Sequence, residues 1–188
     1  HGYFWKNEAS EITGMKKRRL QTLLRHDINL FAYHLPLDIH PELGNNAQLG
    51  ALLGFTEISA LASVEPVGVV RQTRLTEAVS LATIAERLEQ QLQRPVFMHD
   101  AGIGEIRHIA WCTGGGQGYI DAAAAAGAQL FISGEVSEQT IHSANELGIH
   151  FIAAGHHATE RYGVKALGEW LAAQTGVEVT FVDLYNPA

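Results

Sequence analysis

Short apolar runs alternate with longer segments of helical periodicity in the second half of the chain. In residues 134–147, for example, apolar and small side chains recur every three or four positions and share one helical face. Strands separated by helices of this length predict a parallel sheet with right-handed crossovers. We predict its strands at "HIAWCT" (108–113), "QLFIS" (129–133), "IHFIAA" (149–154) and "VEVTFVDL" (177–184).

The first half fits the same scheme more loosely. Its pattern changes around residues 59–70, which favours a domain boundary there, and Pro41 suits the first turn of a helix. We predict helices over 15–26, 41–54 and 76–92, strands over 27–34 and 95–99, and a loop at "HLPLD" (34–38).

Polar and glycine-rich segments follow three of the predicted strands. In a parallel sheet the carboxyl ends of the strands lie along one edge, where open α/β folds bind ligands. This edge would bring together "TGGGQG" (113–118), "SGEVSE" (133–138) and "AGHHATE" (154–160). We therefore expect the chemistry of the protein at this edge.

Composition narrows the class of protein. With 46% hydrophobic and 18% charged residues among 188, the chain is typical of a globular protein. No uninterrupted apolar run approaches the roughly 18 residues of a membrane span, and the net charge of −7 argues against broad nucleic-acid binding. One cysteine and no visible secretory leader favour a reducing, cytoplasmic location. The ten histidines stand out, because histidine is the commonest metal ligand.

Two adjacent histidines precede a carboxylate by about one helical turn. His156 and Glu160 are four positions apart, and His157 and Glu160 are three apart, so either pair could share a helical face. Such a pair could bind a cation or act as a base and its orienting group. The alternative is a surface formed by Glu160 and Arg161, with His157 or Thr159 capping the helix.

Asp38 and Glu135 each allow two interpretations. Asp38 either places a carboxylate before the helix that starts at Pro41 or binds metal, and His34 either supports a ligand or simply closes a strand. Glu135 either caps the following helix or contacts a ligand. The loop 113–118 is typical of a tight turn or of an anion cradle, without the lysine of a P-loop.

Five long motifs together resemble one family. They are "HGYFWK", "AYHLPLDIHPELGNNAQLG", "TGGGQG", "SGEVSEQTIHSA" and "AAGHHATERYGVKAL". The chain is similar to the Ngg-interacting-factor-like dinuclear-metal proteins, the GTP cyclohydrolase type 2 homologues, in their short bacterial form. The resemblance implies an α/β fold of two similar, intertwined three-layer α/β/α halves, with mainly parallel sheets and no inserted middle domain. The first half would span 1–64, completed by the C-terminal strand 177–188, and the second would span 65–176.

The same resemblance implies a set of metal ligands. His1-Gly2 is what remains of the family's His-His-Gly motif, which makes His1 its second histidine, so we expect an upstream segment to carry the first. Asp38 ends the H-x-P-x-D motif, and the G-H-x-x-x-E motif selects His156 and Glu160. His34 and His157 are then candidates for supporting the ligands or carrying protons.

The implied cofactor is two divalent transition-metal ions per subunit: zinc, manganese, iron, cobalt or nickel. The implied assembly is a homohexameric ring with the metal sites facing its interior. The expected function is metal-dependent hydrolysis of a small nucleotide-like substrate. The alternative is a non-enzymatic metal-binding ring that serves as a partner scaffold or metal store. We expect no membrane association and no nucleic-acid partner.

Overall fold

The computed structural model describes residues 8–188 and divides into two compact units, His1–Pro36 and Leu37–Ala188. The described part of the first unit contains helix α1 (Gly14–Arg25) and an extended segment after it. The strand predicted over 27–34 does not form, because a strand needs a hydrogen-bonded neighbour and this segment pairs with none in the described structure.

The second unit is built around one six-stranded sheet with the order β1-β2-β4-β5-β6-β3. Strands β4, β5 and β6 pair in parallel, whereas β1 with β2, β2 with β4, and β3 with β6 pair antiparallel. The sheet is therefore mixed rather than mainly parallel. The strands are β1 (Ser59–Ala60), β2 (Arg71–Val79), β3 (Phe97–His99), β4 (Ile106–Cys112), β5 (Leu130–Ser133) and β6 (His150–Ala153).

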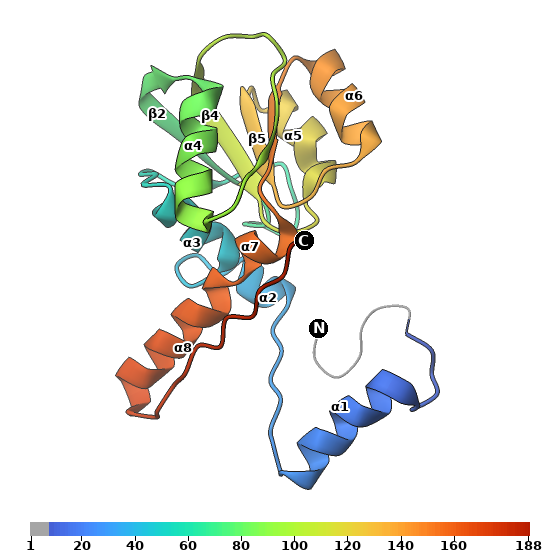
Figure 1. The fold of residues 1–188 in the computed structure, drawn as a ribbon. Helices are drawn as coiled ribbons and strands as arrows, with labels where there is room; N and C mark the ends of the chain where they lie inside the picture. The colour runs from blue at the N-terminus through green and yellow to red at the C-terminus, as the bar shows by residue number, and fades with distance from the viewer. Residues whose placement is uncertain (1–7) are drawn as a thin grey trace. The chain divides into compact units, whose positions relative to one another are not determined.

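Helices cover both faces of this sheet (Figure 1). Because side chains alternate along a strand, Ile109 and Trp111 of β4 join the core under α4, while Ala110 and Cys112 join the core under α5 and α6. The helices are α2 (Leu35–Asp38), α3 (Asn45–Leu52), α4 (Leu81–Leu92), the 3-10 turn η1 (Gln117–Tyr119), α5 (Ile120–Ala125), α6 (Glu138–Leu147), α7 (His156–Glu160) and α8 (Tyr162–Thr175).

The first residues of the predicted helix 76–92 form a strand instead. Residues up to Val79 extend β2, and the helix begins only after Ser80, whose hydroxyl accepts a hydrogen bond from the Thr83 amide at 3.1 Å. A serine in this position caps a helix and blocks its extension upstream. Two further bounds differ from the prediction: α3 begins at Asn45 rather than at Pro41, and the expected loop at 34–38 contains the short helix α2.

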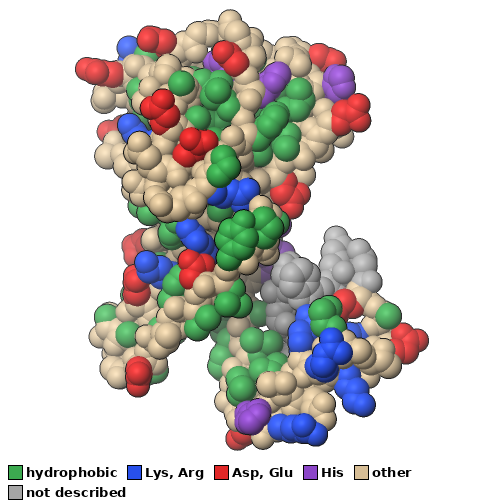
Figure 2. All heavy atoms as spheres, in the orientation of Figure 1, with side chains coloured by type: hydrophobic (Ala, Val, Ile, Leu, Met, Phe, Trp, Pro, Cys, Tyr) green, Lys and Arg blue, Asp and Glu red, His purple; other side chains and the backbone are tan. Residues whose placement is uncertain are grey.

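The predicted C-terminal strand is extended but unpaired. Residues 177–188 contain no strand among the described elements, since no neighbouring strand accepts their hydrogen bonds. Val182, Leu184 and Tyr185 are exposed there, and hydrophobic side chains lie at the surface over this region (Figure 2). The predicted division into two intertwined halves at 64/65 stays a prediction. In the described chain, no helix is long and apolar enough to cross a membrane.

Candidate metal centre

Three loops meet at the carboxyl edge of the parallel strands, as the sequence predicts. The Gly134 amide donates to the Gly114 carbonyl at 2.9 Å, and the Gly155 amide donates to the Gly134 carbonyl at 2.9 Å. These bonds join the loops that follow β4, β5 and β6. The side chains that leave them therefore converge on one place, the position where open α/β sheets bind ligands.

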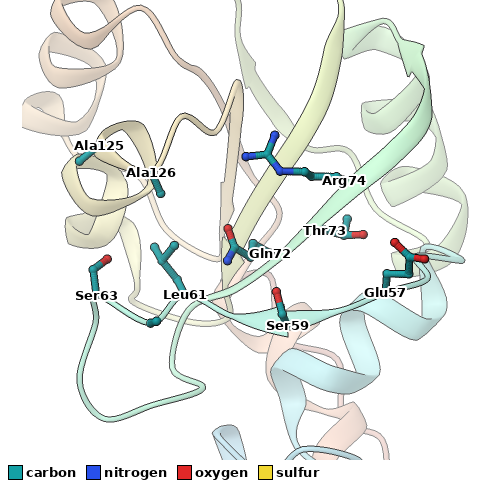
Figure 3. Close-up of a pocket in the computed structure, with 10 residues that line it drawn as sticks. Glu57, Ser59, Leu61, Ser63, Gln72, Thr73, Arg74, Ala125 and Ala126 are labelled. Atoms are coloured by element: carbon teal, nitrogen blue, oxygen red, sulfur yellow. The ribbon is translucent and has the colours of Figure 1, made fainter.

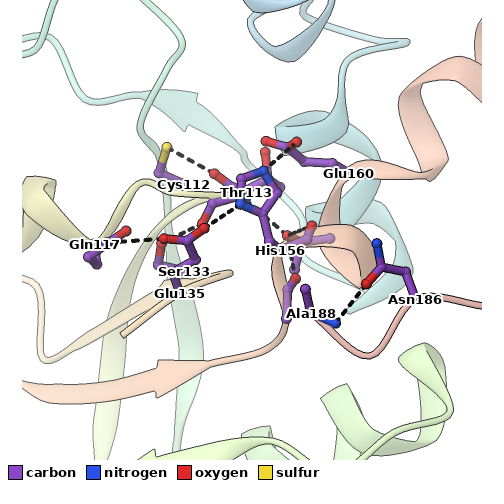
Figure 4. Close-up of polar contacts among 12 residues, drawn as sticks. Cys112, Thr113, Gln117, Ser133, Glu135, His156, Glu160, Asn186 and Ala188 are labelled. Atoms are coloured by element: carbon purple, nitrogen blue, oxygen red, sulfur yellow. Dashed lines mark hydrogen bonds and ion pairs between the residues drawn. The ribbon is translucent and has the colours of Figure 1, made fainter. Parts of the chain in front are cut away.

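His156 lies between two carboxylates at this edge (Figure 4). Its Nδ1 is 2.6 Å from Glu135 Oε1, and its Nε2 is 3.0 Å from Glu160 Oε2. Glu160 stands one turn later on α7, whereas Glu135 comes from the loop after β5. The sequence left the role of Glu135 open, and the structure places this carboxylate directly on the histidine ring.

The two carboxylates favour a charged imidazole. Chiefly through its hydrogen bond, Glu160 raises the pKa of His156 from its ordinary 6.5 to about 9, against partial burial, and Glu135 adds to the effect. The hydrogen bond from His156 in turn lowers the pKa of Glu135. The site thus holds one positive charge between two negative ones, and a cation at Nε2 would take the place of its proton.

His157 faces a different part of the chain. Its backbone amide donates to the Ala188 carbonyl at 3.1 Å, and its Nε2 is 4.0 Å from Asp183 Oδ1. Spacing alone could not choose between the two histidines. In the folded chain it is His156 that contacts Glu160, while His157 contacts the C-terminal segment.

Gly114 permits the close approach of α7. Its φ of +61° suits glycine, and an added Cβ would overlap the Glu160 carboxylate and lie 3.1 Å from His156 Nε2. The Gly114 amide donates to the Thr159 hydroxyl at 3.0 Å, so it is not available to an anion. This glycine therefore makes a tight turn that ties β4 to α7.

Asp38 is buried at the end of α2, and two asparagines hold it there. Asn45 donates to Asp38 Oδ1 at 2.7 Å and accepts from the Gly163 amide at 2.7 Å, just beyond α7. Asn46 bonds the Asp38 carbonyl at 3.4 Å and accepts from the Thr113 amide at 2.9 Å. Sequence reasoning missed both asparagines, although two adjacent buried amides in an apolar helix are an unusual pattern.

The pKa of the Cys112 thiol responds to the carboxylates of the same region. Burial raises the pKa of this thiol to about 12, and the negative charges of Asp38 and Glu160 add to the effect. A thiol with such a pKa stays protonated near neutral pH and is no nucleophile. Both carboxylates are therefore close enough to act on one buried side chain at the end of β4.

The remaining predicted residues, His1 and His34, are not part of the second unit. His1 lies outside the described residues, and His34 belongs to the first unit, after α1. Across residues 8–188, no group of three or more His, Cys, Asp or Glu side chains is arranged to hold a metal ion. The predicted ligands His156 and Glu160 are brought together, and Asn45 links Asp38 to Gly163 in α8, the helix that follows them.

The comparison with known families decides the relationship. The sequence profile of Duf34/NIF3 (NGG1p interacting factor 3) matches residues 1–187. The chain belongs to the DUF34/NIF3 family. It is 58% identical over 189 residues to the GTP cyclohydrolase 1 type 2 homolog of Yersinia pestis and 56% identical to that of Escherichia coli K12. Each alignment covers 100% of this chain and 74% of the relative.

Solved structures of relatives share the fold. The protein ybgI, described as of unknown function, superposes with a TM-score of 0.91 at 54% identity, over 99% of this chain and 74% of that one. TTHA1606 from Thermus thermophilus superposes with a TM-score of 0.86 at 33% identity, over 98% of this chain and 73% of that one. The α/β fold expected from the resemblance to this family is thereby confirmed, apart from its intertwined halves and its mainly parallel sheets.

The described residues fit a divalent transition ion in donor chemistry. Imidazole nitrogen and carboxylate oxygen face each other at His156 and Glu160, and Glu135 accepts from the opposite ring nitrogen. A carboxylate on the far nitrogen is the usual partner of a metal-binding histidine, because it fixes the tautomer with its lone pair toward the ion. The arrangement therefore suits metal binding through Nε2.

Proposed function

We propose that His156, Glu160 and Asp38 bind divalent transition-metal ions, two per chain, and that the protein hydrolyses a small nucleotide-like substrate. The observation that carries the proposal is the clamp of Glu135 and Glu160 on the two nitrogens of His156, at 2.6 and 3.0 Å. A histidine that only packs or caps a helix has no need of a carboxylate on each side of its ring.

The donor set indicates which ions fit. Imidazole with carboxylates and without thiolate suits zinc, manganese, iron, cobalt or nickel better than magnesium or calcium. Such ions lower the pKa of water and polarise carbonyl or phosphoryl oxygens, which is the chemistry of hydrolysis without a protein nucleophile. Of the protein groups, Glu135 orients the imidazole, Asn45 holds Asp38 in place, and Gly114 leaves room for the Glu160 carboxylate.

The substrate class rests on the relatives. Those from Yersinia pestis and Escherichia coli are named GTP cyclohydrolase 1 type 2 homologs, which motivates a purine nucleotide or a similar ring compound. A name of this kind is a weaker argument than the site, because one fold supports many chemistries. The hexameric ring expected from the resemblance would place several such sites around a common interior.

One observation favours the second candidate, a metal-binding ring without enzymatic activity. A hollow of about 600 Å³ is lined by β2, by the segment 57–63 around β1 and by the end of α5, and none of its lining residues belongs to the metal centre. Gln72 and Arg74 point from β2 toward the side where Ala125 and Ala126 lie (Figure 3). This hollow is thus not a substrate pocket for His156 and Glu160.

A turnover screen separates the two candidates. Wild-type protein and Glu160→Ala, each loaded in turn with zinc, manganese, iron, cobalt or nickel, are incubated with nucleotides, phosphoesters and small cyclic amides. The hydrolase proposal expects turnover that needs both the metal and Glu160. Metal binding without turnover of any of these compounds would favour the scaffold or store, and turnover undiminished in Glu160→Ala would contradict the proposed site.

A further inference from the structure

Residues 183–188 contact the helix that carries His156 and Glu160. We call residues 183–188 the C-terminal strap. The Ala188 carbonyl accepts from the His157 amide at 3.1 Å, and Ala188 lies beside His156 in Figure 4. Within the strap, the Ala188 amide donates to Asn186 Oδ1 at 3.0 Å.

Arg94 fastens the strap at the start of α7. Its Nη1 donates to the Ala188 carbonyl and its Nη2 to the Pro187 carbonyl, both at 3.0 Å, so one guanidinium holds two successive carbonyls. The planar, forked donor set of arginine suits this geometry, and a lysine could not reproduce it. The guanidinium also lies against Gly155, where φ is +98° and any added Cβ would overlap Arg94 Nη1.

A second contact fastens the strap at the other end of α7. Arg161 follows Glu160 directly, and its Nη1 is 2.9 Å from Asp183 Oδ2. Its Nη2 also donates to the Leu92 carbonyl at 3.4 Å, at the end of α4. Both ends of α7 are thus attached to the strap. Both attachments also involve α4, because Arg94 follows this helix closely and Arg161 bonds its last residue, Leu92.

Helix α7 depends on such attachments. It has 5 residues, and helices so short are not stable by themselves, because few hydrogen bonds offset the cost of ordering the backbone. On one side of α7, the Thr159 hydroxyl accepts a hydrogen bond from the Gly114 amide. On another, the His157 amide donates to the Ala188 carbonyl of the strap. The distance between His156 Nε2 and Glu160 Oε2 is set within this same short helix.

We infer that the C-terminal strap, clamped by Arg94, positions α7 and so sets the metal affinity of the His156–Glu160 pair. The inference rests on the proposed metal site and adds Arg94 as a positioning residue, which touches neither His156 nor Glu160 through a hydrogen bond. The direction in which Arg94→Ala changes the metal affinity distinguishes two effects. Removing a positive charge beside a cation site would by itself strengthen cation binding, whereas loss of the clamp weakens it.

The test is a zinc titration against a competing chelator. Arg94→Ala should bind zinc about tenfold more weakly than wild type, at the lower end of the ~10–100-fold known for lost partners of metal-binding histidines. Arg94→Lys, which can reach one carbonyl but not both, should lie between them. Arg107→Ala is the matched control, because Arg107 also donates to a backbone carbonyl, that of Thr76. Arg107 lies at the start of β4, whereas the metal centre lies beyond the end of this strand. This variant should bind zinc as wild type does.

A second readout needs no metal. The Thr159 amide donates to the Gly155 carbonyl at 3.1 Å, and its hydrogen exchange in the metal-free protein should be faster in Arg94→Ala, with the amides of β5 unchanged. Unaltered zinc affinity in Arg94→Ala would overturn the inference, with or without faster exchange. Glu160→Ala run in parallel keeps the two proposals apart: if it loses zinc while Arg94→Ala does not, only the role of the strap is refuted. If Glu160→Ala keeps full affinity, the metal site itself is refuted and the inference falls with it.

Discussion

Replacing Gly114 by alanine tests how closely the loop after β4 must approach α7. The added Cβ would overlap the Glu160 carboxylate and lie 3.1 Å from His156 Nε2. The backbone has little freedom to yield, because the Gly114 carbonyl accepts from the amides of Gly134 at 2.9 Å and Glu135 at 3.2 Å. Its own amide is bonded to Thr159. The side chain of Glu160 must therefore swing away from the histidine.

The cost to stability should be small. An L-residue in the left-handed region loses about 1–2 kcal/mol, while replacing glycine by alanine recovers roughly 0.4–1 kcal/mol through the unfolded chain. The net backbone loss is about 1 kcal/mol, which for a chain of this size lowers the midpoint of thermal unfolding by roughly 2–4 °C, and the loss of the His156–Glu160 ion pair adds to it. The effect on the site should be much larger. Displacing a direct ligand should weaken metal binding by more than the ~10–100-fold of a lost supporting contact.

The assay combines thermal unfolding of the metal-free protein with zinc titration against a chelator. Gly115→Ala is the matched control, since its φ is not in the left-handed region and its nearest neighbours, the carboxylate atoms of Glu135, lie at an ordinary 3.7–3.8 Å. It should change neither quantity. Gly114→Ala with the zinc affinity of wild type would refute the reasoning, because Glu160 would then not be needed where the structure places it.

Three further outcomes follow from the same geometry, and a fourth from the family resemblance. In a zinc titration, His156→Ala should reduce affinity more than His157→Ala; the reverse order would move the ligand by one residue. Glu135→Gln should lower the pKa of His156, followed by NMR titration, and an unchanged pKa would contradict the contact. Because the folded-state pKa of His156, about 9, lies above its ordinary 6.5, the stability that its ion pairs contribute is complete below pH 6.5. It should fade as the pH rises through about 9 in metal-free denaturation experiments, and His156→Gln should lack this dependence. Light scattering should find a homo-oligomer larger than a dimer, and a stable monomer would count against the ring.

Local patterns were enough to predict the part of the fold that carries the site. The runs that became β4, β5 and β6 are short, apolar and separated by helices, and parallel connections of that kind leave few alternatives for where the loops meet. The pairing of His156 with Glu160 follows from their spacing on a helix, whatever the rest of the chain does.

Other features depend on partners distant in the sequence. Residues 76–79 have a helix-compatible pattern, yet Val79 pairs with Ile106 in β2 and β4, which only the folded sheet determines. The choice of His156 over His157 depends on how the chain enters α7 at Gly155, with a φ of +98°, and on the strap that engages His157. Residues 177–184 read as a strand because their apolar residues alternate, but an extended segment becomes a strand only where another strand pairs with it.

The central claim is that Glu160 and His156 form a metal site, and metal content tests it most directly. Wild-type protein and Glu160→Ala are purified in parallel, exposed to the same excess of zinc, freed of unbound ions and analysed for zinc and for protein concentration. The account predicts two divalent ions per chain in the full-length wild-type protein, which includes the expected upstream histidine, and a clear loss in full-length Glu160→Ala. Equal metal content in the two proteins would contradict it.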